Sequence, residues 1–347
     1  MKNKGFDRSI VSLNIYDNYD SESLYTVAIP TYKRSRLLKE SLDSIFSQEK
    51  ISFSFNIVVV DNNPERDDET ERLMSKYKEK PNLSYYKNEE NLGMVGNWNR
   101  LFLLSRTKYV IMLHDDDLLH PLFMYYIDEQ IQNENCDVLK PKEYRWRDEG
   151  SPIDFPKILT KTRSSRIYDI ENFNGFPIGA PTGCLFNRQR FLDFGGFNEV
   201  FSPAAGDFDF IVRFSARHKV CQLNHYLIGY RLAQNAACNS EVQYSGTDRC
   251  YRIIFDMLKT YHLPTLIINE SWKYYLKGWC KNIKKEWNID FIYEKALSRI
   301  GLSNSRFHLD IVCYIIIKLF VSFYLVLHGK FKVVDLNHWK NKIFKGE

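Results

Sequence analysis

The chain has 347 residues, of which 44% are hydrophobic and 26% charged, and its formal net charge is +5. This length and balance exclude a predominantly disordered chain and allow one large domain with a tail or two smaller domains. The mild charge is spread along the chain and lacks the basic stripe that nucleic-acid binding requires, so we expect no nucleic-acid partner.

The N-terminal residues and the cysteines indicate in which cellular compartment the protein is expected. The first 24 residues contain no apolar run, which argues against a secretory signal. The seven cysteines form no C-x-x-C pair and no Cys/His cluster with zinc spacing. We therefore expect buried or free thiols in a reducing compartment, and a cytoplasmic protein.

Short apolar runs alternate with longer amphipathic stretches over the first 140 residues. The predicted strands are residues 26–30, 56–60, 83–86 and 109–113. The predicted helices are residues 37–46, 68–78 and 95–104. This alternation predicts an α/β fold with a mostly parallel sheet covered by helices.

The second half of the chain is less regular. Residues 140–176 are polar and interrupted by prolines, and we expect loops and short elements there. A further strand–helix unit is predicted over residues 183–194. Beyond residue 246 the pattern becomes helical, which predicts a separate C-terminal helical region.

An apolar segment near the C-terminus raises the question of membrane contact. Residues 311–327 are almost entirely apolar, but Lys318 and Ser322 interrupt them. The segment is shorter than the roughly 20 residues of a spanning helix, and a lysine in its middle is costly in lipid. The sequence favours a buried or interfacial helix, and the lysines that follow would suit an anionic membrane surface. A C-terminal helix packed on the main domain remains the alternative.

Polar residues follow three of the predicted strands at the point where each strand ends. Residues 30–34 follow the first strand, residues 61–63 the second and residues 114–117 the fourth. In an open α/β sheet, ligands collect at the carboxyl ends of the strands. The sequence therefore predicts a binding cleft at this edge of the sheet.

Three consecutive aspartates, Asp115, Asp116 and Asp117, directly follow a buried apolar strand. Their mutual repulsion requires a counter-charge, which a divalent cation such as Mn²⁺ or Mg²⁺ can supply together with substrate phosphates. The alternative is a helix cap, because a helix is expected after Pro121 and acidic residues favour helix starts. Residues 91–96 (NLGMVG) match neither a P-loop nor a dinucleotide-binding fingerprint.

Several ordered motifs resemble the family-2 glycosyltransferases, which have the GT-A fold. In the first half these motifs read VAIPTYKR, VVVDNN, NLGMVGNWN and LHDDD. In the second half they read TGCLFNR, FGGFNE and GDFDFIVRF, so that the resemblance covers roughly residues 25–235. The resemblance implies a GT-A catalytic domain over residues 1–240, with a nucleotide-sugar half at about 25–120 and an acceptor half at about 121–240. Residues 241–347 would form a helical, basic C-terminal region with possible membrane association.

The resemblance also implies roles for individual residues. The nucleotide-binding positions are Pro30, Thr31, Tyr32, Arg34, Asp61, Asn62, Asn91, Gly93, Asn99 and Asp115. Asp61 matches the carboxylate that contacts the base, commonly uracil. By themselves, Asn91, Gly93 and Asn99 favour a turn and a helix cap.

The metal and the catalytic base are implied in the same way. His114 stands in the place of the first aspartate of the family's D-x-D element, so Asp116 and Asp117 take the metal positions. The frame Asp115 and Asp117 remains an alternative. Asp207 matches the general base, although the glutamate that precedes it in the family is Gly206 here. The other interpretation of Asp207 is part of a helix start.

These inferences predict an inverting, metal-dependent hexosyltransferase of bacterial surface polysaccharide synthesis. It would move one sugar from a nucleotide-diphosphate sugar, with UDP-sugars favoured, to a glycan or lipid-linked glycan. A processive synthase is not expected, because the chain has no Q-x-x-R-W motif. We expect a cytoplasmic protein, possibly peripheral at the inner face of the cell membrane. The rival predictions are a non-catalytic sugar-nucleotide-binding protein of the same fold and a nucleotidyltransferase.

Overall fold

The computed structural model describes residues 4–147, 152–158, 165–167, 179–201, 204–215, 217–232, 239–260, 262–287, 289–304 and 309–327. The chain divides into two compact units. The first comprises Met1–Cys250 and Lys281–Phe291, and the second comprises Tyr251–Cys280 and Ile292–Glu347.

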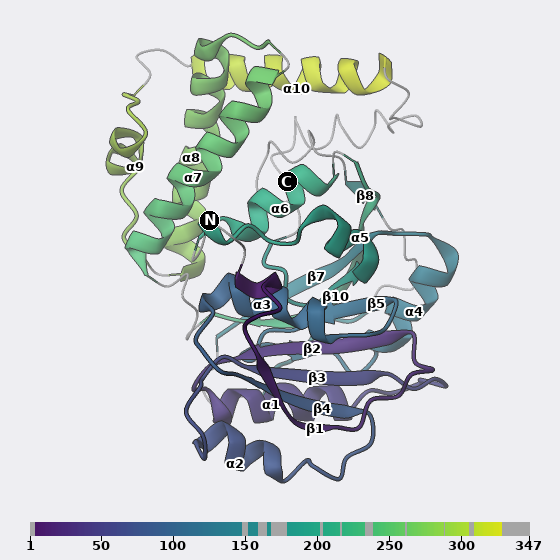
Figure 1. Cartoon of the computed structure of the whole chain (residues 1–347). Helices are drawn as coiled ribbons and strands as arrows, with labels where there is room; N and C mark the ends of the chain where they lie inside the picture. The colour runs from purple at the N-terminus through teal and green to yellow at the C-terminus, as the bar shows by residue number, and fades with distance from the viewer. Residues whose placement is uncertain are drawn as a thin grey trace. The chain divides into compact units, whose positions relative to one another are not determined.

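The first unit is built on a sheet that has ten strands within the described residues (Figure 1). The strands are β1 Ser12–Asp17, β2 Tyr25–Thr31, β3 Asn56–Asp61, β4 Leu83–Asn88, β5 Tyr109–Met112, β6 Leu118–Leu119, β7 Val138–Trp146, β8 Ser165–Ile167, β9 Cys184–Asn187 and β10 Val220–Arg231. Their order is β1-β4-β3-β2-β5-β9-β7-β10-β6, and β8 pairs with β10. Strands β4, β3, β2 and β5 run parallel, as do β7 and β10, whereas β9 is antiparallel to both β5 and β7.

Helices connect these strands as the sequence predicts. They are α1 Ser35–Phe46, α2 Glu69–Ser75, α3 Gly93–Leu104, α4 Phe123–Asn133, α5 Arg188–Phe194 and α6 Gly206–Ser215, with a short 3-10 helix η1 at Lys4–Phe6 and another, η3, at Glu199–Phe201. Helix α3 packs against β2, β3 and β5. The predicted α/β class with a mostly parallel sheet flanked by helices is confirmed.

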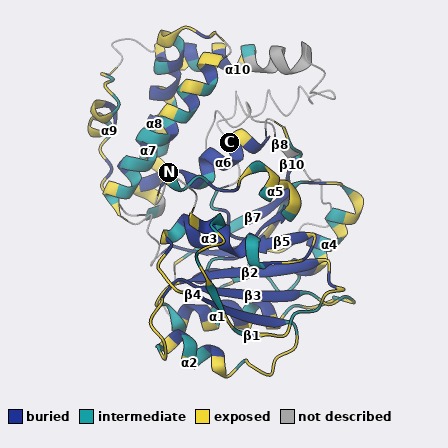
Figure 2. Ribbon diagram, in the orientation of Figure 1, coloured by how far each residue is buried: buried dark blue, intermediate teal, exposed yellow. Residues whose placement is uncertain are grey.

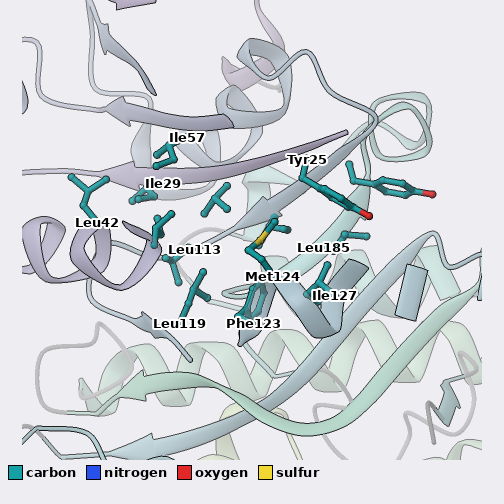
Figure 3. Packing of buried hydrophobic residues seen from close by; sticks show 14 of the residues in the cluster. Tyr25, Ile29, Leu42, Ile57, Leu113, Leu119, Phe123, Met124, Ile127 and Leu185 are labelled. Carbon is teal, nitrogen blue, oxygen red and sulfur yellow. The ribbon is translucent and has the colours of Figure 1, made fainter. Parts of the chain in front are cut away.

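The central strands are buried on both faces, which explains why their sequences are continuous apolar runs. Figure 2 shows these strands in dark blue, and all seven residues of β2 are buried. Because side chains alternate along a strand, Val27 and Ile29 share one face of the sheet. That face packs with Leu42 of α1 and Phe123 of α4 in the main hydrophobic cluster, part of which is drawn in Figure 3.

A second group of aromatic side chains anchors α6 to the same unit. The ring of Phe210 on α6 lies 5.1 Å from Phe191 on α5 and 4.8 Å from Phe197, measured between centroids. Phe102 on α3 stacks against Phe191 at 3.6 Å. Through these rings the helix that begins at Gly206 is fixed against the elements that cover the sheet.

Two features of the second half differ from the sequence-based expectations. Residues 138–146 form the nine-residue strand β7, although loops and short elements were expected from residue 140 onward. Pro141 interrupts the strand pattern in the sequence, and in the structure the register between β7 and β10 shifts directly after it. The twelve-residue strand β10, which pairs with β7 in parallel, was not predicted either.

The expectation of buried or free thiols is wrong for one pair. Cys136 and Cys221 form a disulfide, with their Cα atoms 6.2 Å apart and a separation of 85 positions in sequence. The parallel pairing of β7 and β10 brings the two residues together. A disulfide between residues so far apart in the chain cannot be inferred from the local spacing of cysteines. Cys184, Cys250, Cys280 and Cys313 are free.

The C-terminal region is helical within the described residues, as predicted, although its residues 240–250 and 281–287 belong to the first unit rather than to a separate one. Its helices are α7 Ser240–Thr260, α8 Thr265–Trp287, α9 Tyr293–Arg299 and α10 Leu309–Leu327. In the second unit, Lys277 of α8 donates a 2.6 Å hydrogen bond to Asp310 at the start of α10. Within the part of the chain that the structure describes, no helix is long and apolar enough to cross a membrane.

The aromatic cluster around α6 leads to a stability prediction. Replacing Phe191, which is fully buried, by alanine should lower the free energy of unfolding by about 3–5 kcal/mol, because the cavity cannot fully collapse. Urea denaturation would measure the loss. Phe46→Ala is the control, since that ring is 40% exposed and should cost less than half as much. Equal losses in the two variants would contradict the packing described here.

Candidate active site

The carboxyl ends of β2, β3 and β5 meet at one edge of the sheet, as the sequence analysis expected. Thr31 at the end of β2 lies opposite Asp61 at the end of β3 in the parallel register. On the other side, Leu113 after β5 donates its backbone N–H to Ala28 of β2. Thr31 then donates its hydroxyl to Asp115 Oδ2 over 2.8 Å. The polar ends of neighbouring strands therefore contact one another directly.

Arg34 partly neutralises the aspartates that follow β5. Its guanidinium lies 2.8 Å from Asp116 Oδ2 and 3.4 Å from Asp115 Oδ1. The Arg34 side chain is 37% exposed, whereas the side chains of Asp116 and Asp115 are only 4% and 8% exposed. Burial, with a smaller contribution from Asp116, raises the pKa of Asp115 to about 7, and Arg34 opposes this shift. Arg34 thus compensates only part of the negative charge of these carboxylates.

His114, Asp116 and Asp117 form a cluster that could hold a metal ion. Their possible ligand atoms all lie within 4.8 Å of one another. Asp117 Oδ1 accepts a hydrogen bond from the backbone N–H of Arg231, but Asp117 Oδ2 and His114 Nε2 are buried and have no hydrogen-bond partner. Such orphaned acceptors cost free energy unless something binds them. The donor set of one imidazole and two carboxylates therefore fits a divalent cation.

Burial favours the neutral forms of both His114 and Asp117. Burial lowers the pKa of His114 to about 3, with Lys140 and Arg34 contributing, so its imidazole is neutral at pH 7 and can donate a lone pair. Burial, followed by the charge of Asp116, raises the pKa of Asp117 well above its usual range. A bound cation would reverse that shift by stabilising the charged form. The ring of His114 stacks on Trp98 of α3 at 5.3 Å, which fixes its orientation.

Arg231 is a site residue that the sequence analysis did not identify. Its Nε donates to the backbone carbonyl of Asp116 over 2.8 Å, and its guanidinium also pairs with Glu40 of α1. The guanidinium lies over the ring of Trp146, 4.3 Å from the centroid. Arg231 ends β10, so the long strand that went unpredicted delivers this cation to the carboxylate cluster. A polar residue at the end of an apolar strand was the signal available in the sequence.

A second buried group at this edge comes from β7. Lys140, whose side chain is 1% exposed, donates to the carbonyl of Ala180 over 2.7 Å and also to that of Thr182. Its Nζ lies 2.8 Å from Glu143 Oε1. The hydroxyl of Thr182 accepts the backbone N–H of His114. This pair therefore links β7 to the loop before β9 and to the metal-binding candidate His114.

Asp207 occupies the first turn of α6. Its Oδ1 accepts the backbone N–H of Phe208 over 2.8 Å. Burial raises the pKa of Asp207 to about 6, the charge of Glu143 acts in the same direction and Lys140 opposes it. Asp209, two residues later, is instead occupied by Arg213 through two hydrogen bonds of 2.9 and 3.0 Å. Burial therefore favours a protonated Asp207 below about pH 6, whereas Asp209 is held in an ion pair with Arg213.

Asp61 lies at the predicted edge but is fully buried and paired. Its Oδ2 accepts hydrogen bonds from Lys87 over 2.8 Å and from Tyr85 over 2.9 Å, and its Oδ1 accepts the backbone N–H of Asn63. The side chains of Asp61 and Lys87 are 0% and 1% exposed. Burial raises the pKa of Asp61, and Lys87 counteracts that rise. In this geometry Asp61 fixes the end of β3 rather than facing solvent.

Asn62 ties the end of β3 to the loop before α3. Its amide donates to Asn91 Oδ1 over 2.8 Å and to the carbonyl of Gly93 over 3.2 Å, and its oxygen accepts the N–H of Leu92. Gly93 has φ of +74°, a conformation that favours glycine. The structure thus brings together Asn62, Asn91 and Gly93, three of the positions that were predicted to bind the nucleotide.

Other predicted positions lie apart from this group. Asn99 is fully buried, donates to the carbonyl of Phe197 and accepts that residue's N–H, both over 2.9 Å. It therefore joins α3 to the loop before η3. Pro30 is buried within β2, whereas Tyr32 after that strand is 44% exposed and available to a ligand.

Solved structures share this architecture. The chain superposes on a TarS fragment from Staphylococcus aureus in complex with UDP, with a TM-score of 0.55 at 16% identity, over 90% of this chain and 95% of that one. A mannosyltransferase from Pyrobaculum calidifontis in complex with GDP-Man and Mn²⁺ gives 0.52 at 12% identity, over 94% and 93%. At such identities the likeness establishes the fold. The protein has the GT-A fold of nucleotide-sugar glycosyltransferases.

Sequence comparison points to one family. Residues 26–193, just under half of the chain, match the model for glycosyl transferase family 2. An uncharacterized glycosyltransferase from Methanocaldococcus jannaschii is 30% identical over 150 residues, which cover 36% of this chain and 49% of that protein. An abequosyltransferase from Salmonella typhimurium is 31% identical over 120 residues, 33% of this chain and 35% of that one. The chain thus spans half or less of these two relatives.

The buried pair of Asp61 and Lys87 generates a stability prediction. Lys87→Met leaves a buried carboxylate without its counter-charge, which should cost about 3–5 kcal/mol of unfolding free energy at neutral pH. The deficit should shrink as the pH falls and Asp61 becomes protonated in the variant, because the neutral form needs no counter-charge. Urea denaturation at several pH values would measure this.

Lys78→Met is the matched control, since Lys78 is exposed and should change stability little. Adding Asp61→Asn to Lys87→Met should recover part of the loss. A Lys87→Met variant as stable as the control would show that the pair does not hold the end of β3.

Proposed function

We propose that the protein transfers a single sugar from a nucleotide-diphosphate donor, with UDP-sugars favoured, to a hydroxyl of a glycan or lipid-linked glycan. The observation that carries this proposal is the cluster of His114, Asp116 and Asp117 with two orphaned acceptor atoms at the carboxyl edge of the sheet. The complexes of the two solved relatives with UDP and with GDP-Man and Mn²⁺ support a nucleotide-sugar donor. The relative named an abequosyltransferase supports a role in bacterial surface polysaccharide synthesis.

The donor half has residues suited to a nucleotide diphosphate. Tyr32 is exposed enough to stack on a base, and Arg34 is placed beside the carboxylates to pair with phosphate oxygens. Asp116 and Asp117, with His114, would hold Mn²⁺ or Mg²⁺, and Asp115 would stay bound to Thr31 and Arg34. When bound, the cation supplies positive charge for the diphosphate as it leaves.

The acceptor half would activate the nucleophile. Asp207, whose pKa is raised toward neutrality by burial, would take the proton of the acceptor hydroxyl. The new bond forms between the acceptor oxygen and the anomeric carbon, and the bond from that carbon to the phosphate oxygen breaks. Its electron pair leaves with the nucleoside diphosphate. One such in-line displacement inverts the configuration at the anomeric carbon.

The proposed acceptor also bears on where the reaction takes place. A lipid-linked acceptor would place the reaction at the cytoplasmic face of the cell membrane, with the protein in peripheral contact. A non-catalytic role in nucleotide-sugar binding is favoured by one observation, the glycine at position 206 where the family has a glutamate. The experiments below separate the two roles.

The donor site predicts metal-dependent turnover. A panel of UDP-, GDP- and dTDP-sugars, incubated with Mn²⁺, should contain one donor that is bound and slowly hydrolysed. Asp116→Ala should lower this activity by at least about 100-fold, because it removes a proposed ligand and part of the charge at the diphosphate. Asp43→Ala, on the exposed side of α1, is the control and should leave turnover unchanged.

If no donor binds with or without metal, the proposed function fails. If one binds but is neither hydrolysed nor transferred to any acceptor, the non-catalytic role takes its place.

The raised pKa of Asp207 predicts the pH dependence of transfer. The base must be deprotonated, so kcat at saturating donor and acceptor should fall as the pH drops below about 6, the value to which burial raises its pKa. Asp207→Asn should lower kcat by at least about 100-fold and remove this acidic limb. Asp209→Asn is the matched control and should keep it. An acidic limb that persists in Asp207→Asn would assign the base to another residue.

A further inference from the structure

Helix α10 of the second unit carries a row of exposed aliphatic side chains. The exposed residues are Leu309, Ile311, Val312, Ile315, Ile316 and Leu319, with exposed fractions from 37% to 56%. At 3.6 residues per turn, all six lie on one side of the helix. We call these six residues the α10 stripe. Exposed large apolar residues elsewhere in the described chain are scattered. The stripe is therefore a contiguous apolar patch of the kind that marks an interaction site.

The opposite side of α10 is already occupied by protein. Cys313 and Ile317 are 3% and 0% exposed, and Asp310 is 2% exposed and bonded to Lys277 of α8. The ring of Tyr314 lies 4.6 Å from that of Tyr274 on α8. The helix therefore has one face packed within its own unit and one apolar face that no described residue covers. This division suits a helix lying along a surface.

The charges near the stripe indicate what kind of surface it meets. Among the described side chains of α10, the one acidic group is Asp310, which is buried and neutralised by Lys277. Residues 328–347, which lie outside the described residues, contain five lysines, Lys330, Lys332, Lys340, Lys342 and Lys345, against Asp335 and Glu347. An apolar face continued in sequence by a lysine-rich segment complements a bilayer that carries anionic lipids.

We propose that the α10 stripe docks on the surface of an anionic lipid bilayer, with its aliphatic side chains inserted among the acyl chains. This proposal rests on the exposed stripe and does not depend on the transfer reaction. It also gives a lipid-linked acceptor a physical route to the enzyme. Single apolar helices bind weakly, so the contact is reversible and sensitive to salt.

Co-sedimentation of the purified full chain with vesicles tests the proposal. The wild type should bind vesicles that contain phosphatidylglycerol more strongly than vesicles of phosphatidylcholine alone, and added salt should weaken the binding. The triple variant Val312→Gln, Ile315→Gln and Leu319→Gln should lower the partition coefficient at least about ten-fold, because it removes three inserted side chains. Thermal unfolding and donor hydrolysis without lipid should stay at wild-type values.

A matched control removes the same residue types elsewhere. Val11→Gln, Leu24→Gln and Ile292→Gln replace side chains that are 45%, 53% and 48% exposed but lie outside the stripe, and this variant should bind like the wild type. Failure of the wild type to bind anionic vesicles would overturn the proposal, as would equal binding by the two triple variants. A wild-type dimer that the stripe variant converts to a monomer would overturn it too, by assigning the stripe to a second copy of the chain. Donor hydrolysis measured in parallel keeps these outcomes separate from a failure of the proposed function.

Discussion

The candidate site depends on the burial of three consecutive carboxylates at the end of one strand. Asp115, Asp116 and Asp117 are 6%, 3% and 0% exposed, a placement that is unfavourable unless each charge finds a partner. Thr31 and Arg34 serve the first two, and the backbone of Arg231 serves the third. One oxygen of Asp117 still has no hydrogen bond. The cluster therefore keeps an unpaired carboxylate oxygen, which is the physical basis for proposing that it binds a cation.

Two parts of the sheet meet at this cluster, and each supplies different residues to it. The parallel strands β2, β3 and β5 bring the donor-side residues to one edge through their register. Strands β7 and β10 bring Lys140, Glu143 and Arg231 to the same cluster from the other side. The antiparallel strand β9 joins the two parts. Aromatic packing then holds α6, with Asp207, against this frame. The residues proposed for donor and acceptor chemistry are thus linked by a single sheet.

The sequence predicted those elements that are determined by a local pattern of apolar and polar residues. Continuous apolar runs and helical spacing located β2 to β5 and their helices, and polar residues after these strands located the edge. The pairing of strands far apart in the chain could not be predicted from the sequence. Pro141 and the buried Lys140 made β7 look like a loop, and only the pairing of β7 with β10 brings Arg231 to Asp116 and Cys136 to Cys221. The family resemblance, in turn, assigned a role to Asn99 by its motif alone, whereas the fold engages its amide with Phe197.

The most direct test of the central claim is the position of the metal in a crystal of the protein grown with UDP and Mn²⁺. Anomalous scattering would locate Mn²⁺ independently of any activity. The account predicts one strong peak within about 2.5 Å of carboxylate oxygens of Asp116 and Asp117, in contact with the diphosphate. A peak elsewhere, or UDP bound at this edge with the cluster empty at saturating Mn²⁺, would contradict the assignment of these carboxylates to metal binding.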